Sequence, residues 1–249
     1  MKRTTESTDG RPRKATRVDE LYEAILDRLI TGRLRPGDHL VEPQLAQELQ
    51  CSRTPLRSAL TRLVSEGLLE QRSHCGRFVA HPTPEELRQV FEVRAAIEPL
   101  AARLMATHAS GADLRALAVI CQGLVEARES LDMAAYNRLD FSFHRRIVQA
   151  CGNRYLAAVG HAGALVLLSF MIPDYFQPLN EDLPWPAPEP EDGHVSVYQA
   201  ILTGDGDAAE ARMREHIQAS SEVMQAYLQG VLHREGGEVP QTGRRVASA

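Results

Sequence analysis

The chain has 249 residues, of which 43% are hydrophobic, so it is long enough for two domains with cores of their own. Its net charge of −5 at pH 7 excludes a protein that is basic throughout. The charge is divided, because residues 1–80 hold 14 Lys and Arg against 11 Asp and Glu, whereas residues 81–249 hold 14 against 22. A mildly basic N-terminal part on an acidic body favours nucleic-acid contact by one domain only.

Cysteine usage and hydropathy indicate a cytoplasmic protein without a membrane segment. The first seventeen residues are polar and basic and lack the apolar centre of a signal peptide. Residues 162–172 are apolar, but the run is far shorter than the roughly 20 residues that a membrane helix needs. The cysteines show neither metal-ligand nor disulfide spacing, which is typical of a reducing compartment; they are Cys51, Cys75, Cys121 and Cys151.

The N-terminal part begins with a basic arm and two predicted helices. Residues 1–17 are expected to be disordered. Residues 18–34 carry apolar residues at a helical period, and Gly32 and Pro36-Gly37 end that helix. Residues 42–49 form a second, short helix, and Gln50-Cys51 makes the turn that follows.

A third helix is predicted to begin after Ser52, whose hydroxyl we expect to accept a backbone N–H of the first turn. Arg53 and Arg57 are four residues apart and share one face of this helix. Cations at the exposed start of a helix suit phosphate contact and guanine readout. A different face is apolar, at i, i+4 and i+7: Leu56, Leu60 and Leu63.

Two strands are predicted after the third helix. They cover residues 68–72 and 77–80, and the turn at 73–76 joins them as a hairpin. Three helices followed by a two-stranded hairpin make a winged helix-turn-helix, which we place at residues 18–82. The tip of this wing is expected to reach the minor groove or backbone of DNA through Arg72, His74, Gly76 and Arg77.

The rest of the chain is predicted to be an antiparallel all-helical bundle over residues 83–232, followed by a disordered tail at 233–249. Ligand sites in such bundles are built in the core from facing helices. Residues 173–193 contain six prolines and are expected to form a loop or a lid. The predicted helices cover residues 84–109, 112–129, 133–150, 155–172, 194–203 and 208–230.

A candidate metal site lies in this bundle. Asp140 and His144 are four residues apart on one helix and therefore point the same way. His194 and His216 lie on the last two helices. One carboxylate and three imidazoles suit Zn²⁺, Ni²⁺, Mn²⁺ or Fe²⁺, with positions left for water or a ligand. Spacing alone also allows a structural role, with His216 as a half-buried residue paired with an acid.

Residues 32–68 resemble the N-terminal domain of GntR-type transcription regulators. In that family, the residues that match Arg53, Thr54 and Arg57 touch operator DNA, and the glycine that matches Gly76 approaches the groove. The motifs that carry the resemblance are Leu34-Arg35-Pro36-Gly37, Leu45-Ala46, Ser52-Arg53-Thr54-Pro55-Leu56-Arg57 and Glu66-Gly67-Leu68. The predicted DNA-binding residues are Arg35, Ser52, Arg53, Thr54, Arg57, His74, Gly76 and Arg77.

The resemblance implies a homodimer on a palindromic operator, because the two-fold symmetry of the protein mirrors two half-sites. The chain departs from the family pattern at three places, so the operator sequence itself is not predicted. Gln50-Cys51 stands where Gly-Val is usual, Ser58 where Glu is usual, and Pro43 where some members have arginine.

Residues 85–230 resemble the all-helical FCD effector domain of the FadR-like branch of that family. In metal-binding members, the residues that match Asp140, His144, His194 and His216 hold a divalent ion, and the residue that matches Arg94 can point at an acidic effector. Arg94 has an alternative as an intrahelical partner of Glu98. The resemblance is carried by residues 91–99, Asp140-Phe141-Ser142-Phe143-His144, Gly152-Asn153, and the segment from His194 to His216.

The function predicted from these observations is that of a ligand-responsive DNA-binding transcriptional regulator, with repression the commoner behaviour in the family. Its effector is expected to be a small organic acid. The alternative is a metal-dependent enzyme that uses the aspartate and three histidines. We do not expect the protein to be an enzyme, for two reasons. The sequence offers no clear general base or nucleophile, and it contains a complete winged domain.

Overall fold

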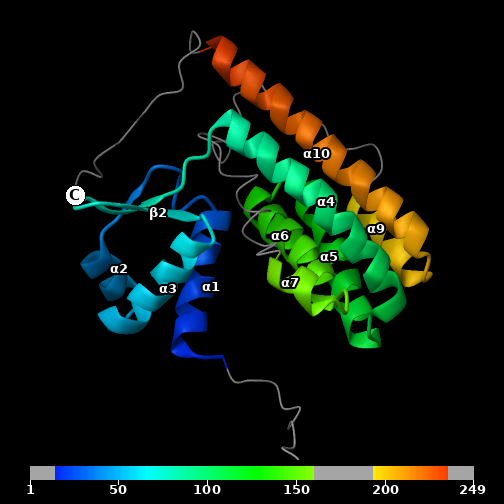
Figure 1. Ribbon diagram of the computed structural model, residues 1–249, viewed down its shortest axis with the longest axis horizontal. Coiled ribbons are helices and arrows are strands. Elements are labelled where there is room, and N and C mark those ends of the chain that lie inside the picture. The colour runs from blue at the N-terminus through cyan, green and yellow to red at the C-terminus, as the bar shows by residue number, and fades with distance from the viewer. Residues whose placement is uncertain (1–14, 160–192, 235–249) are drawn as a thin grey trace, which may run out of the picture.

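The computed structural model describes residues 15–159 and 193–234 (Figure 1). These residues are mainly helical with one small sheet, as the sequence predicts. Four predicted features lie outside the described residues: the basic arm up to residue 14, the helix predicted at 155–172 beyond residue 159, almost all of the proline-rich loop, and the tail from residue 235. Within the described residues, no helix is long and apolar enough to cross a membrane.

The N-terminal part, residues 17–79, is called the head. Helix α1 begins where Thr16 and Asp19 form a reciprocal capping box. It ends at Ile30, earlier than the predicted residue 34, because Gly32 adopts a left-handed backbone conformation with φ 69°. The elements of the head are α1 (Arg17–Ile30), β1 (His39–Leu40), α2 (Glu42–Glu48), α3 (Arg53–Ser65), β2 (Leu69–Arg72) and β3 (Gly76–Val79).

The wing has three strands in the order β1-β3-β2, all antiparallel. The sequence predicts only β2 and β3. Strand β1 has two residues, and His39 pairs with Phe78 while Leu40 pairs with Arg77. A segment this short carries no period-2 pattern, so its pairing depends on the neighbouring strand.

The predicted capping hydrogen bond of Ser52 is wrong. Ser52 is the N-cap residue of α3 and has the expected extended backbone, but its side chain makes no capping hydrogen bond. The first turn of α3 lies at the surface, with Ser52, Arg53 and Thr54 exposed, so water can satisfy its backbone N–H groups.

The core of the head lies between α1, α3 and the wing. The predicted apolar stripe of α3 is fully buried in it. A residue from far along the chain joins this core, because Phe141 belongs to the same hydrophobic cluster. The cluster includes Leu21, Ile25, Leu29, Leu56, Leu60, Leu63, Leu69 and Val79.

The second part of the chain is a bundle of helices in which α4 and α10 lie side by side along much of their length (Figure 1). Capping boxes begin two of the helices, at Thr83 with Glu86 and at Ser110 with Asp113. The described helices are α4 (Pro84–His108), α5 (Gly111–Glu129), α6 (Met133–Ala150), α7 (Arg154–Val159), α9 (Gly193–Leu202) and α10 (Gly206–Arg234).

Helix α4 continues through Pro99, although a proline inside a helix leaves the carbonyl four residues earlier without its usual donor. That carbonyl belongs to Ala95, and the Arg214 guanidinium of α10 lies 3.5 Å from it. A side chain of the neighbouring helix thus provides the hydrogen bond that Pro99 removes.

Helix α6 joins the bundle to the head. Phe141 is buried among the head residues. Arg138 Nε lies 2.5 Å from Asp27 Oδ1 of α1, and Arg145 donates two hydrogen bonds to Glu23, of 2.8 and 3.0 Å. One apolar side chain and two flanking ion pairs therefore attach α6 to α1.

We expect Phe141→Ala to destabilise the protein by about 3 kcal/mol, because truncation of a buried phenylalanine loses its burial and leaves a cavity. Equilibrium denaturation of the full chain measures the change. Tyr155→Ala is the matched control, since Tyr155 is 67% exposed and its truncation should stay within about 0.5 kcal/mol. Equal stability of the two variants contradicts a packed contact between α6 and the head.

Candidate functional site

The four predicted metal ligands meet in the core of the bundle. Asp140 and His144 come from α6, His194 from the start of α9 and His216 from α10. All four side chains are buried, and one ligand atom from each lies within 4.8 Å of the others. Three helices that are distant in sequence therefore converge on one polar cluster inside an apolar core.

Hydrogen-bond distances connect the members of the cluster. His194 Nε2 lies 2.9 Å from Asp140 Oδ1, and His216 Nε2 lies 3.2 Å from His144 Nε2. The rings of His144 and His216 are stacked, with centroids 5.2 Å apart. The other carboxylate oxygen, Asp140 Oδ2, is buried and accepts no hydrogen bond from the described residues.

This donor set fits a divalent cation. Imidazole nitrogens and a carboxylate oxygen are ligands that zinc and neighbouring transition metals prefer. No described residue donates to the buried Asp140 Oδ2, and a buried polar atom without a partner costs free energy. A cation held by these side chains would remove that cost.

Glu98 of α4 supports the cluster, although the sequence suggested it only as a partner of Arg94. Its Oε2 lies 2.5 Å from His144 Nδ1, and its Oε1 accepts a hydrogen bond of 2.7 Å from Arg94 Nε. A carboxylate beside Nδ1 holds the proton there and leaves the Nε2 lone pair directed at the cluster. Glu98 is therefore in the position of a residue that orients a metal-binding histidine.

The two carboxylates are held in their charged form. Burial raises the pKa of Glu98, but the charge of Arg94 and the contact with His144 outweigh burial and lower the pKa to about 2. Burial also raises the pKa of Asp140, but the hydrogen bond with His194, the contact with His144 and the charge of Arg94 bring that pKa below its usual range.

Arg94 has the predicted ion pair with Glu98, and it also reaches the cluster. The guanidinium is buried, with Nε on Glu98 and Nη2 3.5 Å from His144 Nε2. The sequence left two roles open for Arg94, namely an ion pair with Glu98 and contact with an acidic effector. The two are compatible, because one edge of the guanidinium engages Glu98 while another faces the histidines.

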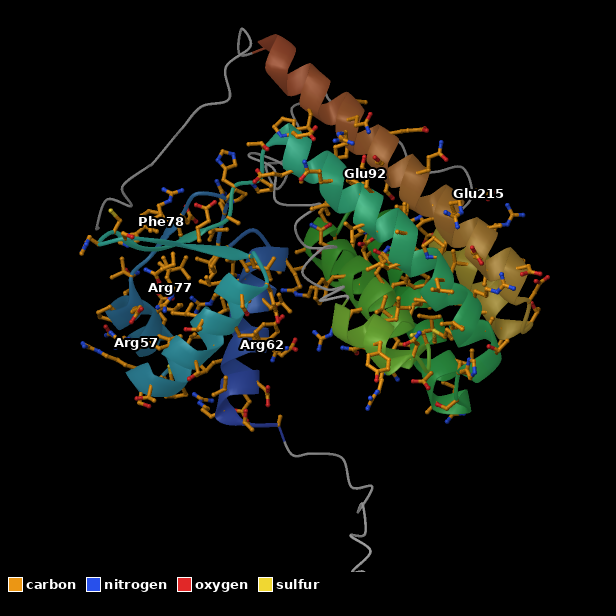
Figure 2. The ribbon with its side chains drawn as sticks, viewed as in Figure 1. Arg57, Arg62, Arg77, Phe78, Glu92 and Glu215 are labelled. Atoms are coloured by element: carbon orange, nitrogen blue, oxygen red, sulfur yellow. The ribbon has the colours of Figure 1, made fainter. Side chains whose placement is uncertain are left out.

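The predicted DNA-binding residues of α3 lie at the surface of the head. Arg53 and Thr54 are exposed in the first turn. Arg57 is exposed one turn later, and its Nε donates a 2.8 Å hydrogen bond to Glu42 of α2. Figure 2 shows Arg57 on the part of the head that is remote from the bundle.

The other predicted DNA-binding residues surround this helix. Arg35 is exposed before β1, and His74 is exposed at the tip of the wing, with φ 60°. Gly76 has φ 96°, and a Cβ there would lie 2.8 Å from His39 Nε2, so only glycine fits without strain. Arg77 is more enclosed, since its guanidinium pairs with Glu42 and lies 3.5 Å from Thr61 Oγ1.

A winged head followed by a helical bundle is the architecture of a DNA-binding regulator with a second domain, and comparisons with known proteins agree. The profile described as "Bacterial regulatory proteins, gntR family" matches residues 17–79, and the FCD domain profile matches residues 89–219. The chain belongs to the GntR family of transcriptional regulators and carries an FCD domain.

Curated relatives agree with this family, and a solved structure shares the fold. The chain is 26% identical to a "Probable D-xylose utilization operon transcriptional repressor" of Paenarthrobacter nicotinovorans, over 93% of this chain and 96% of that protein. It is 30% identical to an uncharacterized HTH-type transcriptional regulator of Mycobacterium tuberculosis, over 87% and 93%. The structure of E. coli McbR/YncC shares the fold, with a TM-score of 0.67 and 21% identity over 89% of this chain and 99% of that one.

We expect Arg57→Ala to weaken binding to a specific operator by about 1–3 kcal/mol, the amount typical of a base-reading arginine. The probe is a duplex enriched from a random pool by the wild-type protein, and a gel shift at fixed salt measures the affinity. Arg115→Ala, an exposed arginine of α5, is the control. Unchanged affinity of the Arg57 variant refutes base readout by this residue.

Proposed function

We propose that this regulator is a cytoplasmic homodimer that represses transcription from a palindromic operator and responds to a small organic acid. A divalent metal, with zinc as our first choice, is held by Asp140, His144, His194 and His216. The buried convergence of one aspartate and three histidines is the observation that carries this proposal. The repressor named among the relatives supports the direction of regulation.

The charge of the cluster favours an acidic effector only when a metal is bound. With the histidines neutral, Asp140 and Glu98 contribute two negative charges and Arg94 one positive charge. The side chains alone therefore repel a carboxylate, whereas a bound divalent ion makes the site net positive and offers open coordination positions to carboxylate oxygens. Arg94 would add a charge-assisted hydrogen bond.

Helix α6 is the route by which the cluster would influence the head. Asp140 and His144 face the cluster, while the neighbouring residues Phe141 and Arg145 contact the head. A shift of α6 that accommodates an effector would therefore also shift the contacts with α1. Coupling of about 1–3 kcal/mol would change operator affinity by roughly 5–150-fold.

The alternative of a metal-dependent enzyme has no support from the comparisons. Both profiles that match the chain describe regulatory domains, and the relatives named above are transcriptional regulators. The buried donor set is therefore interpreted as a sensing site.

We expect His144→Ala combined with His216→Ala to abolish metal binding, because two of four ligands are removed. Elemental analysis of the purified full chain measures the bound metal. His108→Ala is the control, since His108 is exposed at the end of α4. Asp140→Asn keeps the side-chain volume and tests the same site if the double variant folds poorly. Equal metal content in the wild type and both site variants rejects the metal centre.

Binding of a small organic acid should require the metal. In a thermal-shift screen, an effective acid at about 100 times its Kd adds roughly 2.7 kcal/mol of stability to the metal-loaded protein. The same acid should leave the chelator-treated protein unchanged. Equal stabilisation in both samples contradicts the charge argument.

Arg94→Lys should lower the affinity for that acid, because lysine keeps the positive charge but lacks the planar fork that grips a carboxylate. Calorimetry with the metal-loaded protein measures the loss. Undiminished affinity would mean that Arg94 serves only as the partner of Glu98.

A further inference from the structure

A carboxylate lies among the predicted DNA-binding arginines of the head. Glu42 is the first residue of α2, and it accepts hydrogen bonds from Arg57 of α3 and from Arg77 of β3. Figure 2 shows these two arginines on the same part of the head. Glu42 therefore connects α2, α3 and the wing through one side chain.

The two arginines differ in how firmly they are held. The side chain of Arg77 is 15% exposed, and its guanidinium is held by Glu42 and lies near Thr61. The side chain of Arg57 is 64% exposed and reaches Glu42 Oε2 through Nε, at 2.8 Å. Arg77 thus anchors the carboxylate, and the carboxylate in turn orients Arg57.

The contact through Nε leaves the terminal fork of Arg57 available. Its two Nη groups make no hydrogen bond to the described residues in this structure. These groups are the donors that arginine uses toward guanine O6 and N7. Because an unheld arginine must lose side-chain entropy on binding, orientation before DNA arrives lowers the cost of readout.

The same carboxylate opposes binding that depends on phosphates alone. Glu42 neutralises one of the two arginine charges and lies beside two of the predicted DNA-binding residues. Non-specific affinity comes from cations that displace counterions, so a negative charge at this place weakens it. An ordinary surface ion pair orients no base-reading group and adds little to stability.

We propose that Glu42 is a positioning residue for sequence readout: it orients the Arg57 fork toward a guanine and suppresses binding to other sequences. This inference rests on the proposed operator-binding function. It predicts that loss of the Glu42 charge moves specific and non-specific affinity in opposite directions, which a purely structural role would not do.

The experiment uses the full chain and two duplexes. One is enriched from a random pool by the wild-type protein, and the other is a scrambled duplex of the same composition. We expect Glu42→Gln to bind the selected duplex about tenfold more weakly, as for loss of one oriented bidentate contact. It should bind the scrambled duplex more tightly than the wild type does, because a negative charge has been removed.

The matched control is Glu48→Gln, at the other end of α2. Glu48 pairs with Arg28 at 2.5 Å, and neither is a predicted DNA contact, so the substitution removes the same charge from the head. It should raise the affinity for both duplexes alike and leave their ratio unchanged. A Glu42 variant that behaves like this control overturns the inference, as does one that loses both affinities equally.

Two further measurements locate the effect on Arg57. In an Arg57→Ala background, Glu42→Gln should cause no additional loss on the selected duplex. Replacement of the contacted guanine by 7-deazaguanine, which lacks the N7 acceptor, should weaken the wild type and leave Glu42→Gln almost unaffected. Additive losses in either measurement contradict orientation of Arg57 by Glu42.

The design separates this inference from the proposed function. A wild-type protein that enriches no sequence overturns operator binding, and this inference with it. If the wild type enriches a sequence but Glu42→Gln has the same ratio of affinities for the selected and scrambled duplexes as the wild type, only the role of Glu42 is overturned.

Discussion

Helix α6 is shared between the two hydrophobic cores, and the rest of the account depends on that sharing. One face supplies Asp140 and His144 to the polar cluster of the bundle, and Phe141 lies in the core of the head. Ion pairs from Arg138 and Arg145 to α1 flank that contact. Because closely packed helices shift as rigid elements, we propose that a change at the cluster is transmitted to the contact with the head.

The polar cluster imposes a cost that an apolar core would avoid. Buried ionisable groups lose hydration, and they are tolerated only where partners compensate. Here Glu98 lies between Arg94 and His144, and Asp140 is paired with His194. Leucine or valine at the same positions would serve packing alone. We therefore interpret the cluster as a site kept for binding, while the capped helices and the apolar core around it supply stability.

Local patterns in the sequence predicted the helices, the hairpin and the leucine stripe of α3, because periodicity and turn residues act over a few positions. They could not predict what depends on distant partners. Strand β1 is too short for a pattern, and helical periodicity shows that Phe141 is buried without showing in which core. The contacts of Glu98 with His144 and of Glu42 with Arg57 and Arg77 join separate elements. Ser52 occupies the expected cap position, but its side-chain rotamer depends on the exposed surroundings.

The most direct measurement of the link between cluster and head is a coupling experiment on the dissociation constant of the selected operator. This dissociation constant is determined for the wild type and for the Arg138→Gln, Arg145→Gln double variant. Each protein is measured with and without the organic acid that most stabilises the zinc-loaded protein in the thermal-shift screen. The account predicts a change of about 5–150-fold in the wild type. It predicts a much smaller change in the variant, at unaltered metal content. An equal change in both proteins would contradict transmission through α6.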